Sequence, residues 1–390
     1  MRSDRKVQKR LLIIVSGDVL TKEKPYNNIF QVHQAQVLSK YGFAVELLSF
    51  KVMSLKESFS RRAKKRVHLE GITIIRSEKR LFLPHRLRRP EKEAKRHIKV
   101  GLELFTEYVN DFGKPFIIHA HNTMYAGLLA REIKSNFGIE YFITEHHSGY
   151  ARGWISNKLY PSIKAALLDS REIFAVSNQL KEDLVAKLEV GEKGVRLLPN
   201  LVTSSFANDY SYNDNQEFIF LSVGNLDENK NHKLIVHAFN RYLKGLPCYL
   251  KIGGQGPLLR SLKKLVEQLN LEKQIEFLGP LNRQDLCKWM NKAKCFVLSS
   301  DYETFGVVLI EALTYGLPII STDSGGPKDI VKEENGVLVS SQDVDAFGKA
   351  MLSMYQSTDA YNSDTIRNRA ISEFGEKRFI SRYLEILSNN

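Results

Sequence analysis

The chain is poor in cysteine and lacks any long apolar stretch. Its three cysteines, Cys248, Cys287 and Cys295, lie in apolar surroundings without CxxC spacing, which favours reduced core thiols over disulfides or structural zinc. No segment approaches the roughly 18 apolar residues of a membrane-spanning helix. The apolar run at 11–15 is too short for the core of a signal peptide. We therefore expect a cytoplasmic protein without a membrane span.

Short-period repeats and low-complexity tracts are also missing. A length of 390 residues exceeds one ordinary hydrophobic core, so two domains of about 190 residues each are expected. The composition, with 43% hydrophobic and 26% charged residues, is typical of a soluble globular protein.

Apolar runs alternate with helical patterns along both halves of the chain, which predicts an α/β fold with parallel sheets covered on both faces. In the first half, strands are predicted at 11–15, 45–48, 72–75, 116–118, 141–143, 172–176 and 195–197. In the second half they are predicted at 218–223, 249–252, 275–278, 295–298, 319–321 and 336–339. Residues 198–200 and the polar run 208–216 indicate a linker. Because such sheets bind ligands at the carboxyl ends of their strands, each half should contribute one wall of a cleft.

The segment 299–318 carries the most informative pattern. After the strand at 295–298, a loop holds Glu303, Thr304 stands where a helix N-cap is expected, and a periodic run at 305–315 ends at Gly316. A helix N-terminus favours an anion such as phosphate. Glu311 follows the expected cap by seven residues, about two helical turns, and so returns to the same face.

Two carboxylates beside a phosphate site suggest a nucleotide-sugar ligand. Ionised carboxylates only accept hydrogen bonds, which suits the vicinal hydroxyls of a ribose or a hexose. A nucleotide-sugar carries phosphate in its middle and hydroxyls at both ends. The alternative is that Glu303 and Glu311 are ordinary solvated surface residues.

The run Glu303-Thr304-Phe305-Gly306 followed by Glu311 resembles the Glu-x-Phe-Gly-x4-Glu motif of the family 4 glycosyltransferases. The resemblance extends over nearly all of the chain. It implies the GT-B fold, in which two Rossmann-like, doubly wound parallel-sheet domains face each other across a cleft. The implied domains are an acceptor domain at 1–205, rejoined by a C-terminal helix at about 375–390, and a nucleotide-sugar donor domain at 206–374. It also implies a retaining reaction.

The start of the second half matches the family in part. Relatives show Val-Gly-Arg-Leu and then Lys, where Arg and Lys bind the donor's diphosphate; here Gly224 and Lys230 match, and Asn225 replaces the Arg. An amide donates hydrogen bonds but brings no charge. The turn containing Gly254 resembles a family turn and is expected to line the nucleotide site. We expect Lys230, Glu311, Phe305, Gly306, Asn225, Gly224 and Gly254 to bind the donor, without a metal or other cofactor.

Histidines gather at two strand ends of the first half. The run 141–147 resembles the family strand that ends in Thr-x-His, which places His146 in the cleft near the donor sugar; His146 and Glu303 are the expected catalytic residues. His121, Glu145 and Ser177 are further cleft candidates. A lone histidine such as His121 more often has a structural role, and an N-cap role explains Ser177 equally well. A zinc site built from these histidines is disfavoured, because neighbouring residues of a strand point to opposite faces.

Two features of the first half concern substrate loops and partners. Where many relatives carry Gly-Gly, this chain has Asn27-Asn28, so close backbone approach to the substrates is in question there. Residues 51–100 hold 17 Lys or Arg against 5 Asp or Glu, a net +12 that leaves +1 for the other 340 residues. With interleaved apolar residues, this region predicts docking on an anionic membrane surface. One alternative is a basic face that is simply solvated. Nucleic-acid binding is the other alternative, but we do not expect a nucleic-acid partner.

The sequence thus predicts a retaining glycosyltransferase that moves a sugar from a nucleotide diphosphate donor to a hydroxyl of a saccharide or lipid-linked acceptor. Lys230 and the helix end at Phe305 and Gly306 would stabilise the leaving diphosphate. Glu311 would hold the ribose, and Glu303 and His146 the transferred sugar. A GT-B sugar-nucleotide epimerase or phosphorylase is the alternative enzyme, and a basic nucleic-acid-binding protein the alternative of another class. The expected location is the inner face of the membrane, as a peripheral cytoplasmic enzyme.

Overall fold

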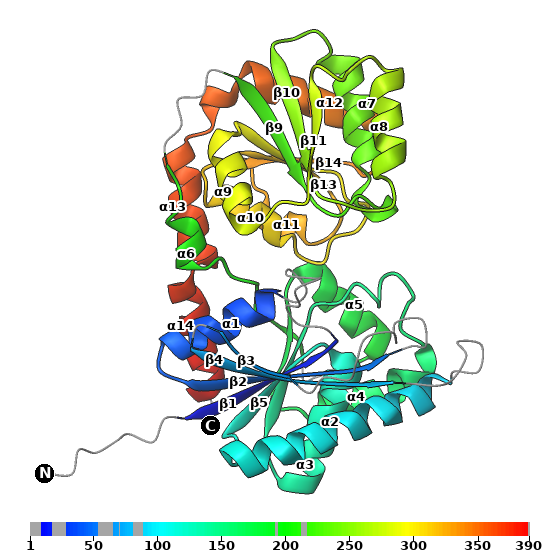
Figure 1. Ribbon diagram of the computed structural model, residues 1–390, viewed down its shortest axis with the longest axis vertical. Coiled ribbons are helices and arrows are strands. Elements are labelled where there is room, and N and C mark those ends of the chain that lie inside the picture. The colour runs from blue at the N-terminus through cyan, green and yellow to red at the C-terminus, as the bar shows by residue number, and fades with distance from the viewer. Residues whose placement is uncertain are drawn as a thin grey trace, which may run out of the picture. The chain divides into compact units, whose positions relative to one another are not determined.

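The computed structural model of the protein describes residues 9–17, 29–53, 65–69, 71–80, 89–191, 194–211 and 217–388. The chain divides into two compact units (Figure 1). The first unit comprises Met1–Pro199 together with Ile380–Asn390, and the second comprises Asn200–Phe379. Each unit has its own sheet.

The first unit is built on an eight-stranded sheet of order β3-β4-β2-β1-β5-β6-β7-β8. The strands are β1 (Arg10–Ser16), β2 (Ala44–Met53), β3 (Lys65–Leu69), β4 (Ile72–Arg80), β5 (Ile117–His121), β6 (Tyr141–Glu145), β7 (Ile173–Ala175) and β8 (Arg196–Leu197). All neighbours pair in parallel except the edge pair of β3 and β4. Each of the seven strands predicted for this half is confirmed, whereas β3 was missed because its basic residues show no apolar alternation.

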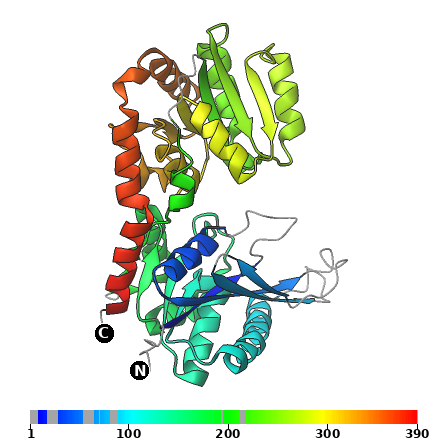
Figure 2. The same cartoon turned by 60° about the vertical axis from the view of Figure 1, so that its left-hand side comes forward.

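Helices cover both faces of this sheet. They are α1 (Ile29–Lys40), α2 (Pro90–Phe112), α3 (Leu128–Phe137), α4 (Tyr160–Asp169) and α5 (Asn178–Leu188), with short turns η3 (Thr123–Gly127) and η4 (Asn157–Leu159). Figures 1 and 2 show α1 on one face and α2 with α3 on the other. The central strand β1 is therefore buried from Leu11 to Val15 on both sides, as expected for a doubly wound sheet.

The second unit has a six-stranded parallel sheet of order β11-β10-β9-β12-β13-β14. Its strands are β9 (Phe218–Val223), β10 (Cys248–Gly253), β11 (Ile275–Gly279), β12 (Cys295–Leu298), β13 (Ile319–Thr322) and β14 (Gly336–Val339). The six strands predicted for this half are all confirmed. The three cysteines are buried and form no disulfide.

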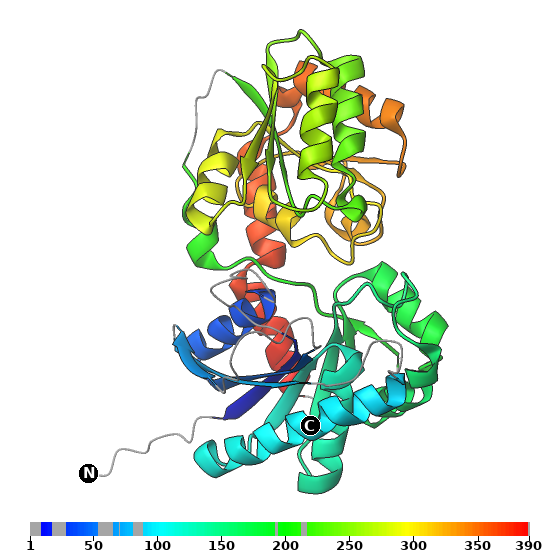
Figure 3. The same cartoon turned by 45° about the vertical axis from the view of Figure 1, so that its right-hand side comes forward.

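Helices also cover both faces of the second sheet. They are α6 (Ser204–Ala207), η6 (Glu228–Lys230), α7 (His232–Tyr242), α8 (Leu259–Gln268), α9 (Arg283–Lys292), α10 (Val307–Leu313), α11 (Pro327–Ile330), α12 (Val344–Gln356), η7 (Thr358–Ala360) and α13 (Ser363–Phe374). Figures 1 and 3 show α7 and α8 on one side of the sheet and α9 with α10 on the other. The main core of this unit forms where α7, α8 and α12 pack on the sheet through residues such as Ile235, Leu262 and Met351.

The last helix, α14 (Glu376–Ser388), begins in the second unit and continues into the first. At its start, the Glu376 carboxylate accepts hydrogen bonds of 2.7 Å from the backbone and the hydroxyl of Ser204. Further along, Tyr383 is fully buried and its hydroxyl lies 3.2 Å from Nδ1 of His119. Among the described residues, no helix is long and apolar enough to cross a membrane.

Both sheets have a point where the strand order reverses. This point lies between β1 and β5 in the first sheet and between β9 and β12 in the second. Ligands of open α/β sheets bind outside the carboxyl ends of the strands at such switch points. The loops that follow these four strands are therefore where a functional site is sought.

Candidate active site

At the switch point of the second sheet, a lysine and a glutamate form an ion pair. Lys230 ends η6, the short turn after β9, and Glu303 lies in the loop after β12. Nζ of Lys230 lies 2.5 Å from Oε2 of Glu303, and both side chains are half-buried. The strand order thus brings together two expected site residues that are 73 positions apart in the chain.

Hydrogen bonds fasten the two loops that carry this pair. The Asn229 side-chain amide donates to the Tyr302 carbonyl at 3.0 Å, and the Asp301 N–H donates to the Asn229 carbonyl at 2.8 Å. The Ser299 hydroxyl donates to the Lys230 carbonyl at 2.8 Å. Since both backbones are fixed independently of the ion pair, a ligand that displaces Glu303 from Lys230 meets a cation already in place.

Two glycines, Gly224 and Gly254, lie in closely packed backbone next to Lys230. Gly254 follows β10 with a φ of 139°, and a Cβ there would lie 1.9 Å from the Gly224 carbonyl oxygen. A Cβ on Gly224 would lie 3.6 Å from the side chain of Lys230. Only glycine fits at position 254. Asn225, the next residue after Gly224, is exposed.

The helix that follows Glu303 starts later than expected. The prediction that Thr304 is its N-cap is wrong: α10 begins at Val307, after Gly306 with a φ of 96°. The reason is that Phe305 is buried against Phe374 of α13, with ring centroids 6.0 Å apart, and the chain turns at Gly306 before the helix begins. The helix ends at Leu313, earlier than the predicted Tyr315, and a turn follows in which Gly316 has a φ of 69° and the Leu317 N–H is bonded to the Ala312 carbonyl.

The later start of α10 changes the structural environment of two expected donor-binding residues, Phe305 and Glu311. The side chain of Phe305 lies in the core, so only its backbone remains accessible for a ligand. The seven-residue spacing from Thr304 to Glu311 no longer spans a helix, because Glu311 is the fifth residue of α10.

Glu311 has an electrostatic partner that the sequence did not reveal. The Glu311 carboxyl is half-buried, and burial raises its pKa to about 7, while the nearby Arg283 opposes the shift. Arg283 is the first residue of α9, where its guanidinium also donates to the Thr203 hydroxyl at 2.9 Å. No motif marks Arg283, since its proximity to Glu311 arises from helix packing.

In the first unit, Glu145 is the centre of a buried hydrogen-bond network. Its side chain is 1% exposed and accepts four hydrogen bonds. Oε2 accepts from the backbone N–H and the hydroxyl of Thr123, at 2.9 and 2.6 Å, and Oε1 accepts from the N–H groups of His146 and His147, at 2.9 and 2.7 Å. Glu145 therefore holds together the loops after β5 and β6.

Three histidines lie side by side at the same strand ends. His119 and His121 are on β5 with ring centroids 4.0 Å apart, and Nδ1 of His121 lies 2.8 Å from Nε2 of His146. Burial lowers the pKa of His146 to about 3 and holds the pKa values of His119 and His121 well below their usual range. All three rings are therefore neutral near pH 7.

Within the part of the chain that the structure describes, two nitrogen atoms of this cluster are buried without a hydrogen-bond partner. They are Nε2 of His121 and Nδ1 of His146. His119 differs, because its Nε2 lies 2.8 Å from the Thr144 hydroxyl and its Nδ1 is bonded to Tyr383. Among the described residues, no group of three or more His, Cys, Asp or Glu is arranged to hold a metal ion.

The candidate Ser177 and the neighbouring residue of His146, His147, have local structural partners. Ser177 caps α5, where its hydroxyl accepts from the Leu180 N–H at 3.2 Å. Nδ1 of His147 accepts from the Gly149 N–H at 2.8 Å. The loop with Asn27 and Asn28, and most of the basic clusters at 61–66 and 85–89, lie outside the described residues.

A cavity opens at the switch point of the first sheet. It has a volume of about 240 Å³ and is lined by Ser16, Gly17, Lys51, Val52, His97, Asn122, Met124, Tyr125, Glu145, His147 and Ile155. Tyr125 stacks on His97 with ring centroids 3.9 Å apart. Its backbone has φ 56° and ψ −57°, a strained conformation of the kind found at ligand-binding sites. No sequence motif marks this aromatic pair.

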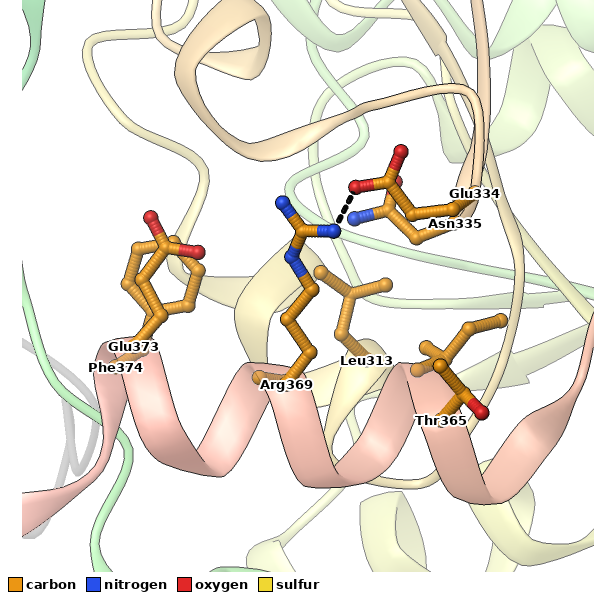
Figure 4. A pocket seen from close by; sticks show the side chains of 9 residues that line it. Leu313, Glu334, Asn335, Thr365, Arg369, Glu373 and Phe374 are labelled. Carbon is orange, nitrogen blue, oxygen red and sulfur yellow. Dashed lines mark ion pairs between the residues drawn. The ribbon is translucent and has the colours of Figure 1, made fainter.

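Two cavities of the second unit are poor candidates. Figure 4 shows a cavity of about 10 Å³ beside α13, where Arg369 is ion-paired with Glu334. It has room for about one water molecule. A larger hollow of about 370 Å³ includes Lys294 and Pro318, the residues before β12 and β13. It therefore lies at the opposite edge of the sheet from Lys230 and Glu303.

Two family models match consecutive parts of the chain. Residues 32–206 match the model described as Glycosyltransferase Family 4, and residues 208–373 match the model described as Glycosyl transferases group 1. A curated relative is the N-acetylgalactosamine-N,N'-diacetylbacillosaminyl-diphospho-undecaprenol 4-alpha-N-acetylgalactosaminyltransferase of Campylobacter jejuni. It is 35% identical over 163 residues, which are 40% of this chain and 43% of that protein. The chain spans about half the length of the curated relatives it matches.

Solved structures match over nearly the whole chain. Sucrose-phosphate synthase from Thermosynechococcus elongatus has a TM-score of 0.77 at 20% identity, covering 97% of this chain and 98% of that one. HepE from Anabaena, in complex with UDP and glucose, has a TM-score of 0.73 at 13% identity, covering 98% and 100%. At these identities the likeness shows the fold.

Proposed function

Because the chain belongs to the family 4 glycosyltransferases and has their GT-B fold, we propose that it transfers a sugar from a nucleoside diphosphate sugar to a hydroxyl of a saccharide or lipid-linked acceptor. The observation that carries this proposal is the Lys230–Glu303 pair at the switch point of the second sheet. A cation and a hydroxyl-binding carboxylate side by side suit the junction between a diphosphate and a sugar.

In the donor site, Lys230 stabilises the negative charge that develops on the leaving diphosphate, which is the main electrostatic demand of the reaction. Gly224 and Gly254 let the backbone approach the nucleotide, and Gly306 gives the N–H groups at the start of α10 access to phosphate. Glu311 accepts hydrogen bonds from the ribose. The exposed Asn225 adds a hydrogen-bond donor where relatives have an arginine.

At the reacting sugar, Glu303 moves from Lys230 to accept hydrogen bonds from a hydroxyl, and His146 binds the same sugar. The acceptor binds in the first unit's cavity, where Tyr125 stacked on His97 offers an aromatic face to a sugar ring. By family the transfer retains the anomeric configuration of the donor. Analysis of the product's anomeric carbon tests this part, and an inverted product contradicts it.

Support for a lipid-linked acceptor comes from the Campylobacter relative, whose name includes diphospho-undecaprenol. Support for a UDP-sugar donor comes from HepE, whose structure holds UDP and glucose. Membrane docking through the basic region 51–100 would bring the enzyme, on the cytoplasmic side, to such an acceptor. Each cation near an anionic surface contributes about 1 kcal/mol.

Calorimetric titration with UDP, GDP, ADP and their common sugar conjugates tests the donor site. We expect one nucleotide to bind and Lys230→Ala to weaken it, while Lys251→Ala leaves binding unchanged. Lys251 is the matched control because it forms an equally short ion pair, with Glu276, elsewhere in the same unit. Binding that is unaffected by Lys230→Ala contradicts the proposed donor site.

Two further experiments separate the alternatives. With a bound donor but no acceptor, release of a free epimerised sugar identifies an epimerase, and phosphate-dependent release of a sugar phosphate identifies a phosphorylase. Vesicle sedimentation tests docking: we expect binding to vesicles with anionic lipid, and a loss of binding when the basic residues at 61–66 are replaced by Gln. Equal binding to neutral vesicles contradicts the docking role.

A further inference from the structure

The histidine cluster of the first unit contains a direct hydrogen bond between two imidazole rings, those of His121 and His146. Nδ1 of His121 and Nε2 of His146 lie 2.8 Å apart, so one of them donates a hydrogen bond to the other. Each ring has a single remaining nitrogen, and both of these atoms are buried without a partner. Each neutral ring carries one N–H proton. The ring that donates the hydrogen bond therefore has its proton at the contact, and the ring that accepts it has its proton on the remaining nitrogen.

Two arrangements of the protons are possible, and they differ in which ring carries an unpaired N–H. If His146 donates, the fully buried His121 must hold an N–H at Nε2 with no acceptor. If His121 donates, the unpaired N–H lies on the buried Nδ1 of His146, a residue that is 8% exposed as a whole against 0% for His121. Deeply buried N–H groups without an acceptor are rare and costly. The second arrangement is therefore favoured.

The described neighbours of His121 do not alter this preference between the two proton arrangements. His119 stacks on His121, but both of its nitrogens are already bonded, to Thr144 and to Tyr383. His146 is fixed on its other side by its backbone N–H, which donates to Asn122 and Glu145 at 3.2 and 2.9 Å, and its ring lies against Phe30, with centroids 4.8 Å apart. The ring of His146 is thus held in place with one nitrogen left for a ligand.

We propose that His121 is a positioning residue whose Nδ1–H donates a hydrogen bond to Nε2 of His146 and so fixes His146 as a hydrogen-bond donor at Nδ1. This inference rests on the proposed function, in which His146 binds the transferred sugar. The Nδ1–H group then donates to an oxygen atom of that sugar, and the unpaired nitrogen gains its partner only when the donor substrate is bound. No proton is transferred, because His146 stays neutral throughout.

The direct test is long-range ¹H–¹⁵N NMR of the imidazole nitrogens in the full chain, with His146→Gln used to assign the signals. In the wild type we expect His146 to be protonated at Nδ1 and not at Nε2, and His121 likewise. In His121→Leu, which removes the donor, we expect His146 to show a mixture of tautomers. In His121→Asn, which has the shape of Leu but keeps a donor near the position of Nδ1, we expect the wild-type tautomer.

Kinetics provides the second readout. We expect His121→Leu to lower kcat/KM for sugar transfer roughly 10–100-fold, mainly through kcat, and His121→Asn to recover most of that loss. His119→Leu is the matched control, because His119 has the same burial on the same strand but its ring nitrogens bond to Thr144 and Tyr383 instead of to His146; it should lower stability without changing the His146 tautomer.

The outcomes separate the two proposals. A wild-type His146 protonated at Nε2, or a His121→Leu variant with unchanged tautomer and kcat, overturns the role of His121. If the tautomers behave as expected but no donor or acceptor pair gives transfer, the proposed function fails while the hydrogen-bond arrangement stands. Equal losses in His121→Leu and His121→Asn would show that only packing matters.

Discussion

The strand ends of the two sheets carry polar groups that are held in different ways. In the second unit, Lys230 and Glu303 are half-buried and bonded mainly to each other. In the first unit, Glu145 is 1% exposed and satisfied by four donors from two loops. A charge pair that a ligand can separate is suited to binding. A fully satisfied buried carboxylate is suited to holding loops in position.

This difference in hydrogen bonding also distinguishes residues that the sequence analysis treated alike as cleft candidates. Glu145 and His146 are neighbours in the chain and both are cleft candidates, yet all acceptor sites of Glu145 are used internally, whereas His146 keeps an unpaired Nδ1. Burial alone does not separate functional from structural polar residues. The number of partners that each buried atom lacks is the more informative quantity.

The largest expected effect concerns the stability of the first unit. Glu145→Ala removes the acceptor of four buried N–H and O–H donors, so we expect a loss of about 3–5 kcal/mol in the free energy of unfolding. Glu303→Ala, at the half-buried pair, should cost at most about 1 kcal/mol. Urea denaturation of both variants measures the two losses in the free energy of unfolding. Similar losses would contradict the proposed difference between the two sites.

The next effect separates the two members of the charge pair. Lys230→Ala should weaken UDP binding and lower kcat by roughly a hundredfold or more, because it removes charge stabilisation of the leaving group. Glu303→Gln should lower kcat while UDP binding stays equal or tightens, because Lys230 is released to the diphosphate. Calorimetry and initial rates give both values. If Glu303→Gln weakens UDP binding as much as Lys230→Ala does, the assigned division of roles is wrong.

A smaller effect follows from the raised pKa of Glu311. The folded protein holds this proton up to a pKa of about 7, against a usual value of 4.5, so the free energy of unfolding should fall as pH rises through this window. Glu311→Gln removes that loss and should be more stable than the wild type at pH 8 by about 1–3 kcal/mol. Denaturation curves from pH 5 to 8 check this, with Glu276→Gln as an exposed control; parallel pH profiles for the wild type and Glu311→Gln contradict it.

The smallest effect tests whether Ser177 is more than a helix cap. Ser177→Ala removes the hydrogen bond to the Leu180 N–H and should cost about 1 kcal/mol of stability. Ser177→Asp keeps a capping acceptor and should recover most of it. Sugar-transfer rates should stay within a few-fold in both variants, and a large kinetic loss with an intact cap would place Ser177 in the site.

The sequence alone predicted thirteen of the fourteen strands found in the described residues, and the Lys230, Glu303 and Glu311 candidates. The strands of a doubly wound sheet are short, continuous apolar runs, a local pattern that can be read directly. β3 (Lys65–Leu69) was missed because it is an antiparallel edge strand with exposed basic residues. The N-cap at Thr304 was misplaced because burial of Phe305 against Phe374, a contact between distant parts of the chain, outweighed the local cap preference.

Only the tertiary structure decided which polar groups meet. The pairing of Lys230 with Glu303, of Glu311 with Arg283, and of His121 with His146 joins residues from different strand ends and helices. Such contacts depend on strand order and helix packing, which residue spacing does not encode. The sequence therefore determined most of the secondary structure and the residue types available for chemistry. The fold determined which of those residues are free to bind a ligand, because burial and hydrogen bonding are properties of the packed chain.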